Sequence, residues 1–269
     1  AIFAAFPHWY ATLFSGFYLA LFLMLLALIG RGVAFEFRSK EDRPGWRNLW
    51  DWVLCAGSLV PALLWGVAVT NLVKGVPIDS HMQYAGNFFT LLSPYTLVGG
   101  LATLLLFTFH GALFLSLKTG GELVERARGV GGKLGILAAA ALLLLVVLSY
   151  SQTGIMGRAG VAVLFWAAVV LALAAWWLLR SGRHAGAFVG NSLAIVFTTG
   201  AIFGGLFPRV MVSSLDPRWS LTVYNASSSP YTLKVMTIVA LTLVPVVLLY
   251  QGWTYWVFRR RVGGGDLEY

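Results

Sequence analysis

The sequence predicts an all-α, polytopic integral membrane helix bundle, and three observations support this fold class. Hydrophobic residues make up 59% of the 269-residue chain and charged residues only 11%, whereas soluble globular domains carry about 25% charged residues. The mean hydropathy is +0.80. The apolar residues also fall into runs of roughly 20, the length that a helix needs to cross a bilayer. We therefore expect residues 1–269 to form a single transmembrane helical domain.

Seven complete spans are expected along the chain. Each should be helical, because backbone polar groups inside lipid must form their hydrogen bonds within the segment. The expected spans cover residues 10–30, 52–74, 95–117, 134–150, 159–180, 186–206 and 232–258.

The connections between these spans alternate in charge. Segments 31–51, 118–133, 180–185 and 259–269 hold fourteen of the nineteen lysine and arginine residues. Because positively charged loops stay on the cytoplasmic side, these segments are expected to be cytoplasmic, with residue 1 outside and the C-terminus cytoplasmic. The net charge of +9 then reflects membrane topology and requires no nucleic-acid partner.

Local patterns predict further details. Ala1 to Phe6 look like the end of a hydrophobic run that Pro7 closes, so the sequence is expected to begin part-way through a helix. Cys55 is expected to be a small buried side chain. Two small-xxx-small spacings, at residues 186–190 and 200–204, predict close helix packing. Ser229 and Pro230 are expected to cap and begin the last helix.

Ionisable groups inside the spans are scarce. All ten acidic residues lie in connections or at helix ends, so Asp and Glu build no proton relay or ion site within these spans, which weakens a transporter interpretation. His110 is the one histidine well inside a span and is placed like an axial haem ligand. A second ligand is missing, because the other three histidines lie near the surfaces or in loops, so a hydrogen-bonded interior histidine is the alternative.

Arg31 directly follows Gly30 at the end of the first complete span. Its stem can lie along the helix while the guanidinium group reaches the interface. The alternative is a bidentate pair with a carboxylate of a neighbouring helix or subunit.

Several stretches together resemble subunit II of cytochrome bd-type quinol oxidases, and the resemblance covers essentially the whole chain in order. The segments are GRGVAFEFRSK (30–40), WRNLWDW (46–52), VAVTNLVKGVP (67–77), FPRVMVSSL (207–215), NASSSPYTLKVMT (225–237) and LVPVVLLYQGWTYWVF (243–258).

The resemblance implies a haem-free subunit in a bacterial inner (plasma) membrane. Its partner would be a haem-bearing subunit I that carries two b-type haems and haem d, oxidises quinol and reduces O2 to water. This chain would then hold no catalytic residue and no metal. It would support the partner across an apolar interface and contribute to proton access. A structural quinone bound to this chain is a further possibility that the resemblance implies.

The sequence departs from the family pattern at its start. Family members have two further N-terminal helices, which would turn the seven spans into nine and which carry acidic residues proposed for the proton route. Ala1 corresponds to the tail of the second family helix. Arg31 and Glu36 are the candidate polar or subunit-contact residues at the cytoplasmic end, and His110 is a weak intramembrane candidate. The alternative function is a secondary transporter or channel.

Overall fold

The computed structural model describes residues 2–260, and seven of its helices are long and apolar enough to cross a membrane. The predicted fold class is therefore confirmed, while a single domain over the full 1–269 stays a prediction. The spanning helices are α3 (Tyr18–Phe37), α4 (Pro44–Lys74), α5 (Pro94–Lys118), α6 (Glu122–Gln152), α7 (Ala159–Arg180), α8 (His184–Leu206) and α9 (Pro230–Val257). Two short helices, α1 (Ile2–Ala5) and α2 (Pro7–Gly16), precede them.

Helix starts follow from local capping chemistry. Before α5, the Ser93 hydroxyl accepts a hydrogen bond from the Thr96 N–H while the Thr96 hydroxyl accepts one from the Ser93 N–H. This reciprocal capping satisfies two backbone donors that have no partner inside the helix. Ser229 caps α9 and Pro230 is its first residue, which confirms the predicted start of the last helix.

Two connections predicted from hydropathy prove to be mostly helical. The predicted segment 31–51 contains the end of α3 and the start of α4, and most of segment 118–133 belongs to α6. Hydropathy reports where lipid contact ends, whereas a helix continues as long as its backbone bonds and side chains allow. Glu122 and Glu125 lie in the first turn of α6, where negative charge is favourable.

Most of the buried core lies among α5, α6, α7 and α8, and it extends to the end of α4. Small residues line its α7–α8 interface, and Ala168, Ala172 and Ala175 of α7 are all fully buried. A Cβ atom placed on Gly190 would lie 3.4 Å from the Ala175 Cβ atom, so the first small-xxx-small spacing packs within this chain. Gly204, in the second spacing, has open space around it.

One end of the bundle is closed by irregular chain, which we call the capped end (residues 75–93 and 207–229). Here β1 (Arg209–Met211) pairs antiparallel with β2 (Leu221–Thr222), and a 3-10 turn η3 (Pro217–Trp219) lies between them. Another 3-10 turn, η1 (Phe88–Leu91), precedes α5, and η2 (Ile155–Gly157) joins α6 to α7. The two capped-end segments are joined by backbone bonds, since Val76 N–H donates to Val212 O at 3.0 Å and Ser214 N–H to Val76 O at 2.9 Å.

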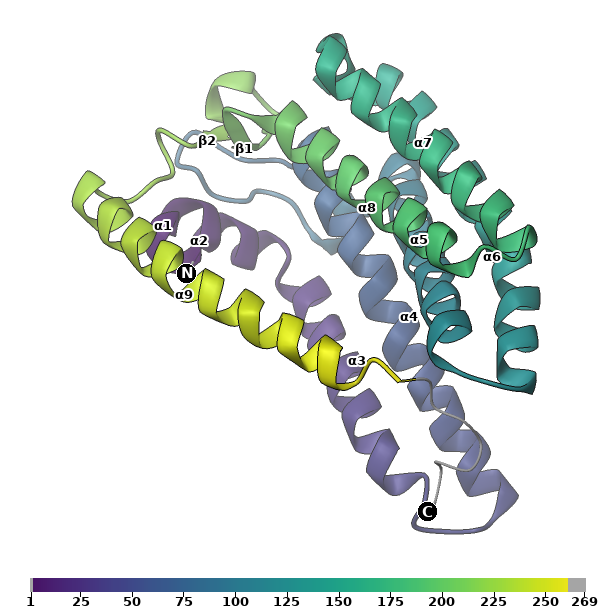
Figure 1. Cartoon of the computed structure of the whole chain (residues 1–269). Coiled ribbons are helices and arrows are strands. Elements are labelled where there is room, and N and C mark those ends of the chain that lie inside the picture. Colours follow the sequence, from purple (N-terminus) through teal and green to yellow (C-terminus); the bar gives the residue numbers. More distant parts are fainter. Residues whose placement is uncertain (1, 261–269) are drawn as a thin grey trace.

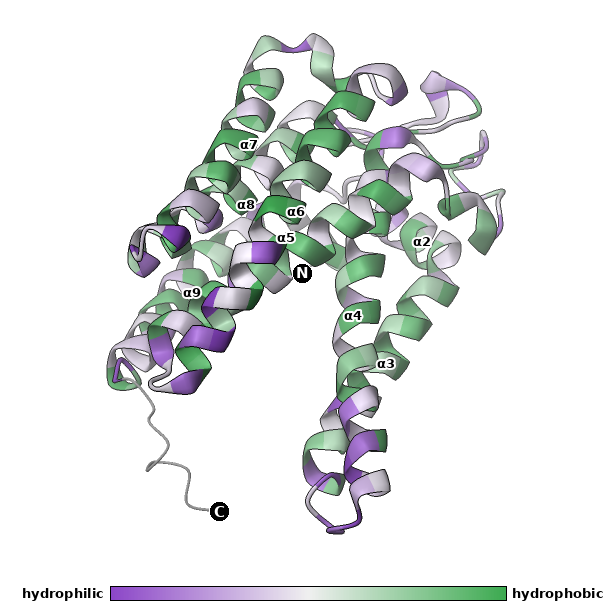
Figure 2. Ribbon diagram, turned by 90° about the vertical axis from the view of Figure 1, so that its right-hand side faces the viewer, coloured by the Kyte–Doolittle hydropathy of each residue, from purple (hydrophilic) through white to green (hydrophobic). Residues whose placement is uncertain are grey.

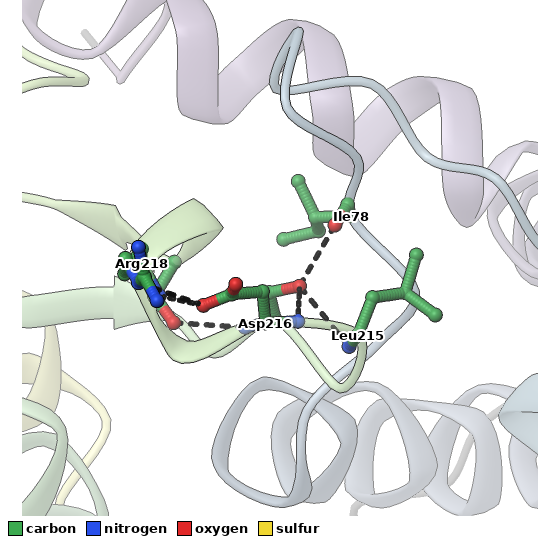
Figure 3. A network of polar contacts seen from close by, with 6 residues as sticks. Ile78, Leu215, Asp216 and Arg218 are labelled. Carbon is green, nitrogen blue, oxygen red and sulfur yellow. Dashed lines mark hydrogen bonds and ion pairs between the residues drawn. The ribbon is translucent and has the colours of Figure 1, made fainter.

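Side chains complete this cap. The Ser213 hydroxyl donates to the Ile78 carbonyl at 2.8 Å and accepts from the Leu215 N–H at 3.3 Å. Figure 3 shows Ile78 on one segment facing Leu215 and Asp216 on the other, with Arg218 beside Asp216. The Asp216 carboxylate accepts a hydrogen bond from the Arg218 N–H at 2.8 Å. Segments more than a hundred residues apart thus form one unit.

The opposite end, which we call the basic end, comprises residues 31–51, 118–133, 180–185 and 259–260. Figure 2 shows hydrophilic residues concentrated on the far tip of the α3–α4 hairpin, away from the capped end. Residues 261–269 of the predicted basic segment 259–269 lie outside the described residues.

The last helix stands apart from the core. None of the residues of α9 is buried, and Figure 1 shows it along one edge of the bundle, in front of α2 and α3 and apart from α5 to α8. The Lys118 ammonium group, at the end of α5, donates to the Phe258 carbonyl at 2.7 Å. This apolar helix of 28 residues therefore has little packing on the rest of this chain.

Candidate functional site

The site is built on the place where α4 and α5 touch. A Cβ atom on Gly66 would lie 2.6 Å from the Gly99 carbonyl oxygen, and one on Gly100 would lie 2.8 Å from the Leu63 carbonyl oxygen. Real Cβ atoms do not approach backbone so closely, so only glycine allows this backbone contact. This contact fixes the position of α4 relative to α5, and it lies in the half of the bundle nearer the capped end.

Buried polar side chains surround this crossing. The Asn71 amide donates to Val67 O at 2.8 Å and to Leu91 O at 2.9 Å, and the Thr96 hydroxyl donates to the same Leu91 carbonyl at 2.7 Å. Both side chains are almost completely excluded from the surface. Because buried polar groups are stable only when hydrogen-bonded, this network joins α4 to the chain that leads into α5.

On the other side of the crossing, toward the basic end, a groove of about 1020 Å³ opens between α4, α5 and α6. Its walls are mainly apolar, from Leu59 of α4, Leu104 and Phe107 of α5, and Leu134 of α6. Two basic residues line it as well, Arg31 on α3 and Arg126 on α6. The groove therefore combines an apolar channel with positive charge.

The prediction of a buried Cys55 is wrong, because this side chain is exposed and lines the groove. Hydropathy recognises that Cys55 lies in a span but cannot tell a core-facing position from a groove-facing one. Arg31 is expected from the sequence to end its span, but it lies within α3, which continues to Phe37. A Cβ atom on Gly57 would lie 2.7 Å from the Arg31 Cβ atom, so α3 packs closely on α4 beside this arginine.

The candidate Glu36 lies at the tip of the α3–α4 hairpin, where its carboxylate pairs with Lys40 at 3.1 Å and is largely exposed. Nearby, Arg38 Nε donates to Asp51 Oδ1 at 2.6 Å, joining the end of α3 to the start of α4. The Asp51 carboxylate raises the pKa of the Arg38 guanidinium above its ordinary value, chiefly through that hydrogen bond. The structure does not bring Arg31 and Glu36 together in an ion pair.

His110 lies inside α5, half-buried, as predicted. Its Nδ1 atom lies 3.3 Å from the Asn191 amide nitrogen of α8, and its ring stacks on Phe188 at 4.5 Å between centroids. Another histidine contact lies nearer the basic end, where His184 Nδ1 is 3.2 Å from Ser116 Oγ. These contacts agree with a hydrogen-bonded interior histidine.

Asn191 is a residue that sequence reasoning missed. It is fully buried, and its Oδ1 atom has no hydrogen-bond partner among the described residues. The signal that could have found it is an amide side chain in the middle of an apolar run, since such groups in lipid normally face another helix. Asn71 carries the same signal.

A second apolar pocket, the capped-end pocket, has a volume of about 430 Å³ and lies between α2, α4, α5 and α8. Trp9, Trp65 and Phe203 contribute rings to its wall, and Thr103 and Thr199 contribute hydroxyl groups. Both hydroxyls donate to carbonyls one turn back in their own helices, at 2.9 and 2.8 Å. Within residues 2–260, no three His, Cys, Asp or Glu side chains gather where they could hold a metal ion.

Comparisons with known proteins agree along the whole described chain. The family model for cytochrome bd terminal oxidase subunit II matches residues 1–258. Cytochrome bd ubiquinol oxidase subunit 2 of Bacillus subtilis is 45% identical over 267 residues, covering 97% of this chain and 78% of that protein. Cytochrome bd-I ubiquinol oxidase subunit 2 of Escherichia coli is 38% identical over 312 residues, covering all of this chain and 80% of that protein.

A solved structure shares the fold. A chain of the bd oxidase from Geobacillus thermodenitrificans superposes with a TM-score of 0.64 at 16% identity, over 88% of this chain and 72% of that one. At this identity the superposition supports only the arrangement of the helices.

Proposed function

The chain belongs to the family of subunit II of cytochrome bd terminal oxidases, and from this premise we propose that it is the haem-free subunit of a bacterial quinol:O2 oxidoreductase. In this proposal a haem-bearing subunit I oxidises quinol and reduces O2 to water, and the isolated chain is not catalytic. The observation that carries the proposal is the family match over residues 1–258. The transporter or channel alternative is not favoured.

The proposed role is a support for the haem-bearing subunit within the membrane. The uncovered surface of α9 and the low burial of α3 supply apolar area for such a partner. Packing between helices in lipid depends on close contact along their length, and α9 has little of it on this chain. We propose that subunit I covers α9.

Proton access is the second part of the proposal. In the spans, the described residues place imidazole, amide and hydroxyl groups in pairs, with His184 beside Ser116 and His110 beside Asn191. Imidazole and hydroxyl groups can relay protons along bound water, which an amide group can orient, without a buried carboxylate. We propose that this side of α5 and α8 contributes to the supply of protons to the partner.

A structural quinone is a further element of the proposal. The capped-end pocket fits an apolar ring or isoprenoid chain in size and lining. Trp65 would offer an N–H donor to a quinone carbonyl, because the Thr103 and Thr199 hydroxyls already donate within their helices. We also propose a bacterial inner-membrane location with the basic end cytoplasmic, following the positive-inside rule.

Co-purification tests the main proposal. The tagged chain, extracted from its own membrane, should bring a second chain whose reduced-minus-oxidised spectrum shows b- and d-type haem bands, and the preparation should consume O2 with added quinol. Folded chain that repeatedly purifies without haem and without quinol-driven O2 consumption would contradict the proposal.

Cross-linking tests the docking face. Leu241→Cys on α9 and Val170→Cys on α7 replace side chains that are 72% and 62% exposed. A photoactivatable group on the α9 position should link to the haem-bearing chain, whereas the same group on α7 should link to lipid. Equal cross-linking from both positions would remove α9 as the docking face.

A further inference from the structure

The groove toward the basic end has a charge pattern that the subunit role does not explain. Arg31 lies six residues before the end of α3, which is about 9 Å at the rise of an α-helix. The apolar run of this span ends at Gly30, so Arg31 lies where the boundary between headgroups and hydrocarbon is expected. The Arg31 guanidinium group forms no ion pair with any described carboxylate.

The carboxylates nearest in sequence are already paired elsewhere. At the hairpin tip Glu36 contacts Lys40, Glu41 contacts Arg43, and Asp51 contacts Arg38. Across the groove, Arg126 lies 3.4 Å from Glu122, in a pair whose side chains are both largely exposed. Of the two arginines that line the groove, only Arg126 is paired with a described carboxylate, and that pair is exposed, so the groove keeps a net positive charge.

The rest of the groove is suited to hydrocarbon. Leu59, Leu104 and Phe107 line it away from the arginines. Gly111 of α5 also lines it and has no neighbouring atom within 4 Å of where a Cβ would lie, so the groove is open along α5. The polar hydroxyl of Thr108 donates to Leu104 O within its own helix, and offers no free donor to a polar ligand.

These features together select an amphiphile with an anionic head at the membrane surface and an apolar tail. We propose that the groove binds one anionic diacyl phospholipid, with its phosphate between Arg31 and Arg126 and an acyl chain along α4 and α5. Guanidinium groups suit this role because their planar fork matches phosphate oxygens. The inference does not depend on the oxidase proposal.

Native mass spectrometry tests it on the protein extracted from its own membrane with the subunits that accompany it. The preparation is delipidated, then exposed to dioleoyl phosphatidylglycerol or to dioleoyl phosphatidylcholine, which share acyl chains and differ in net charge. We expect one retained phosphatidylglycerol per chain. Arg31→Gln with Arg126→Gln should lower its retention about tenfold, as expected when charge-assisted hydrogen bonds are lost.

Matched variants keep the test decisive. Arg43→Gln removes a charge at the same end outside the groove and should leave lipid retention unchanged. Gly111→Leu fills the groove without altering charge and should displace the lipid, whereas Gly132→Leu, another open helical glycine outside the groove, should not. This pair tests the site even if the arginine variants fold poorly.

Four results would overturn the proposal. Phosphatidylcholine could be retained as well as phosphatidylglycerol, showing an apolar contact only. The double arginine variant could retain lipid unchanged. Finally, inorganic phosphate could compete fully with the lipid, or Arg31→Gln could release the accompanying subunit without affecting lipid, which would assign Arg31 to a free anion or to a partner carboxylate.

Discussion

The capped end and the basic end of this bundle are built from different interactions. In the half of the bundle nearer the capped end, α4 and α5 meet at glycines and are joined by buried amide and hydroxyl groups, and in the capped end itself the two loop segments are paired. At the basic end the helices diverge around a groove, and the charged contacts are exposed to solvent. The comparison teaches that similar helices form a rigid unit where their backbones meet, and leave binding space where they do not.

The largest loss of stability is expected from adding side-chain volume where α4 and α5 cross. Gly66→Val would place new atoms against the Gly99 carbonyl and Thr103, and the crowding should lower the free energy of unfolding by about 2–3 kcal/mol. Thermal unfolding in detergent measures the effect. Gly132→Val, at an open helical position, is the control, and equal loss of stability in both variants would contradict the special role of the crossing.

Removing the buried amide beside the crossing should have a slightly smaller effect. Asn71→Leu leaves the apolar volume nearly intact but removes one of two donors to the Leu91 carbonyl. We expect a loss of about 1–2 kcal/mol, because the Thr96 hydroxyl still satisfies that carbonyl. Asn48→Leu, at an exposed position near the start of α4, serves as the control and should leave the melting temperature unchanged. If Asn71→Leu melts like the unaltered chain, the network does not stabilise the capped end.

The cap itself should respond more weakly. Ser213→Ala removes the bond to Ile78 that joins the two loop segments, and we expect a loss of about 1 kcal/mol. Faster protease cleavage within residues 75–93 provides a local readout. Ser151→Ala, which removes an exposed hydroxyl bonded within its own helix, should leave cleavage unchanged. Identical cleavage of the two variants would argue against the two segments acting as one unit.

The smallest effect is expected at the hairpin tip. Arg38→Gln breaks the pair with Asp51, whose side chains are about half exposed. Exposed ion pairs contribute little because water and salt screen them, so the melting temperature should stay the same at low and high salt. A clear, salt-dependent drop in the melting temperature would show that the basic end depends on its charges for stability, as the capped end depends on its buried contacts.

Much of the fold could be predicted from the sequence because lipid imposes a simple rule. The seven apolar runs, the cap at Ser229 and the clustering of basic residues all follow from composition along the chain. The helices extend beyond the predicted spans, as α6 does from Glu122, because hydropathy measures contact with lipid and not the hydrogen bonding of the backbone.

The candidate site could be predicted only in part. The sequence identifies Arg31 and His110 as unusual by their position within or beside a span. It does not identify Asn191 as the partner of His110 or Cys55 as a groove residue, because these depend on which face of each helix meets a neighbour. The level at which α4 and α5 cross depends on Gly66 and Gly99, which lie on different helices and form no recognisable spacing in either one.

The backbone contact between α4 and α5 at a single level gives the molecule a fulcrum. A slight tilt of α4 about Gly66 would change the width of the groove while leaving the capped end almost unmoved. The reason is that α4 extends much further from Gly66 toward the basic end than toward the capped end. Changes in lateral pressure or thickness of one leaflet would therefore act on that side first. The same glycine contact that holds the helices together makes the protein mechanically asymmetric across the membrane.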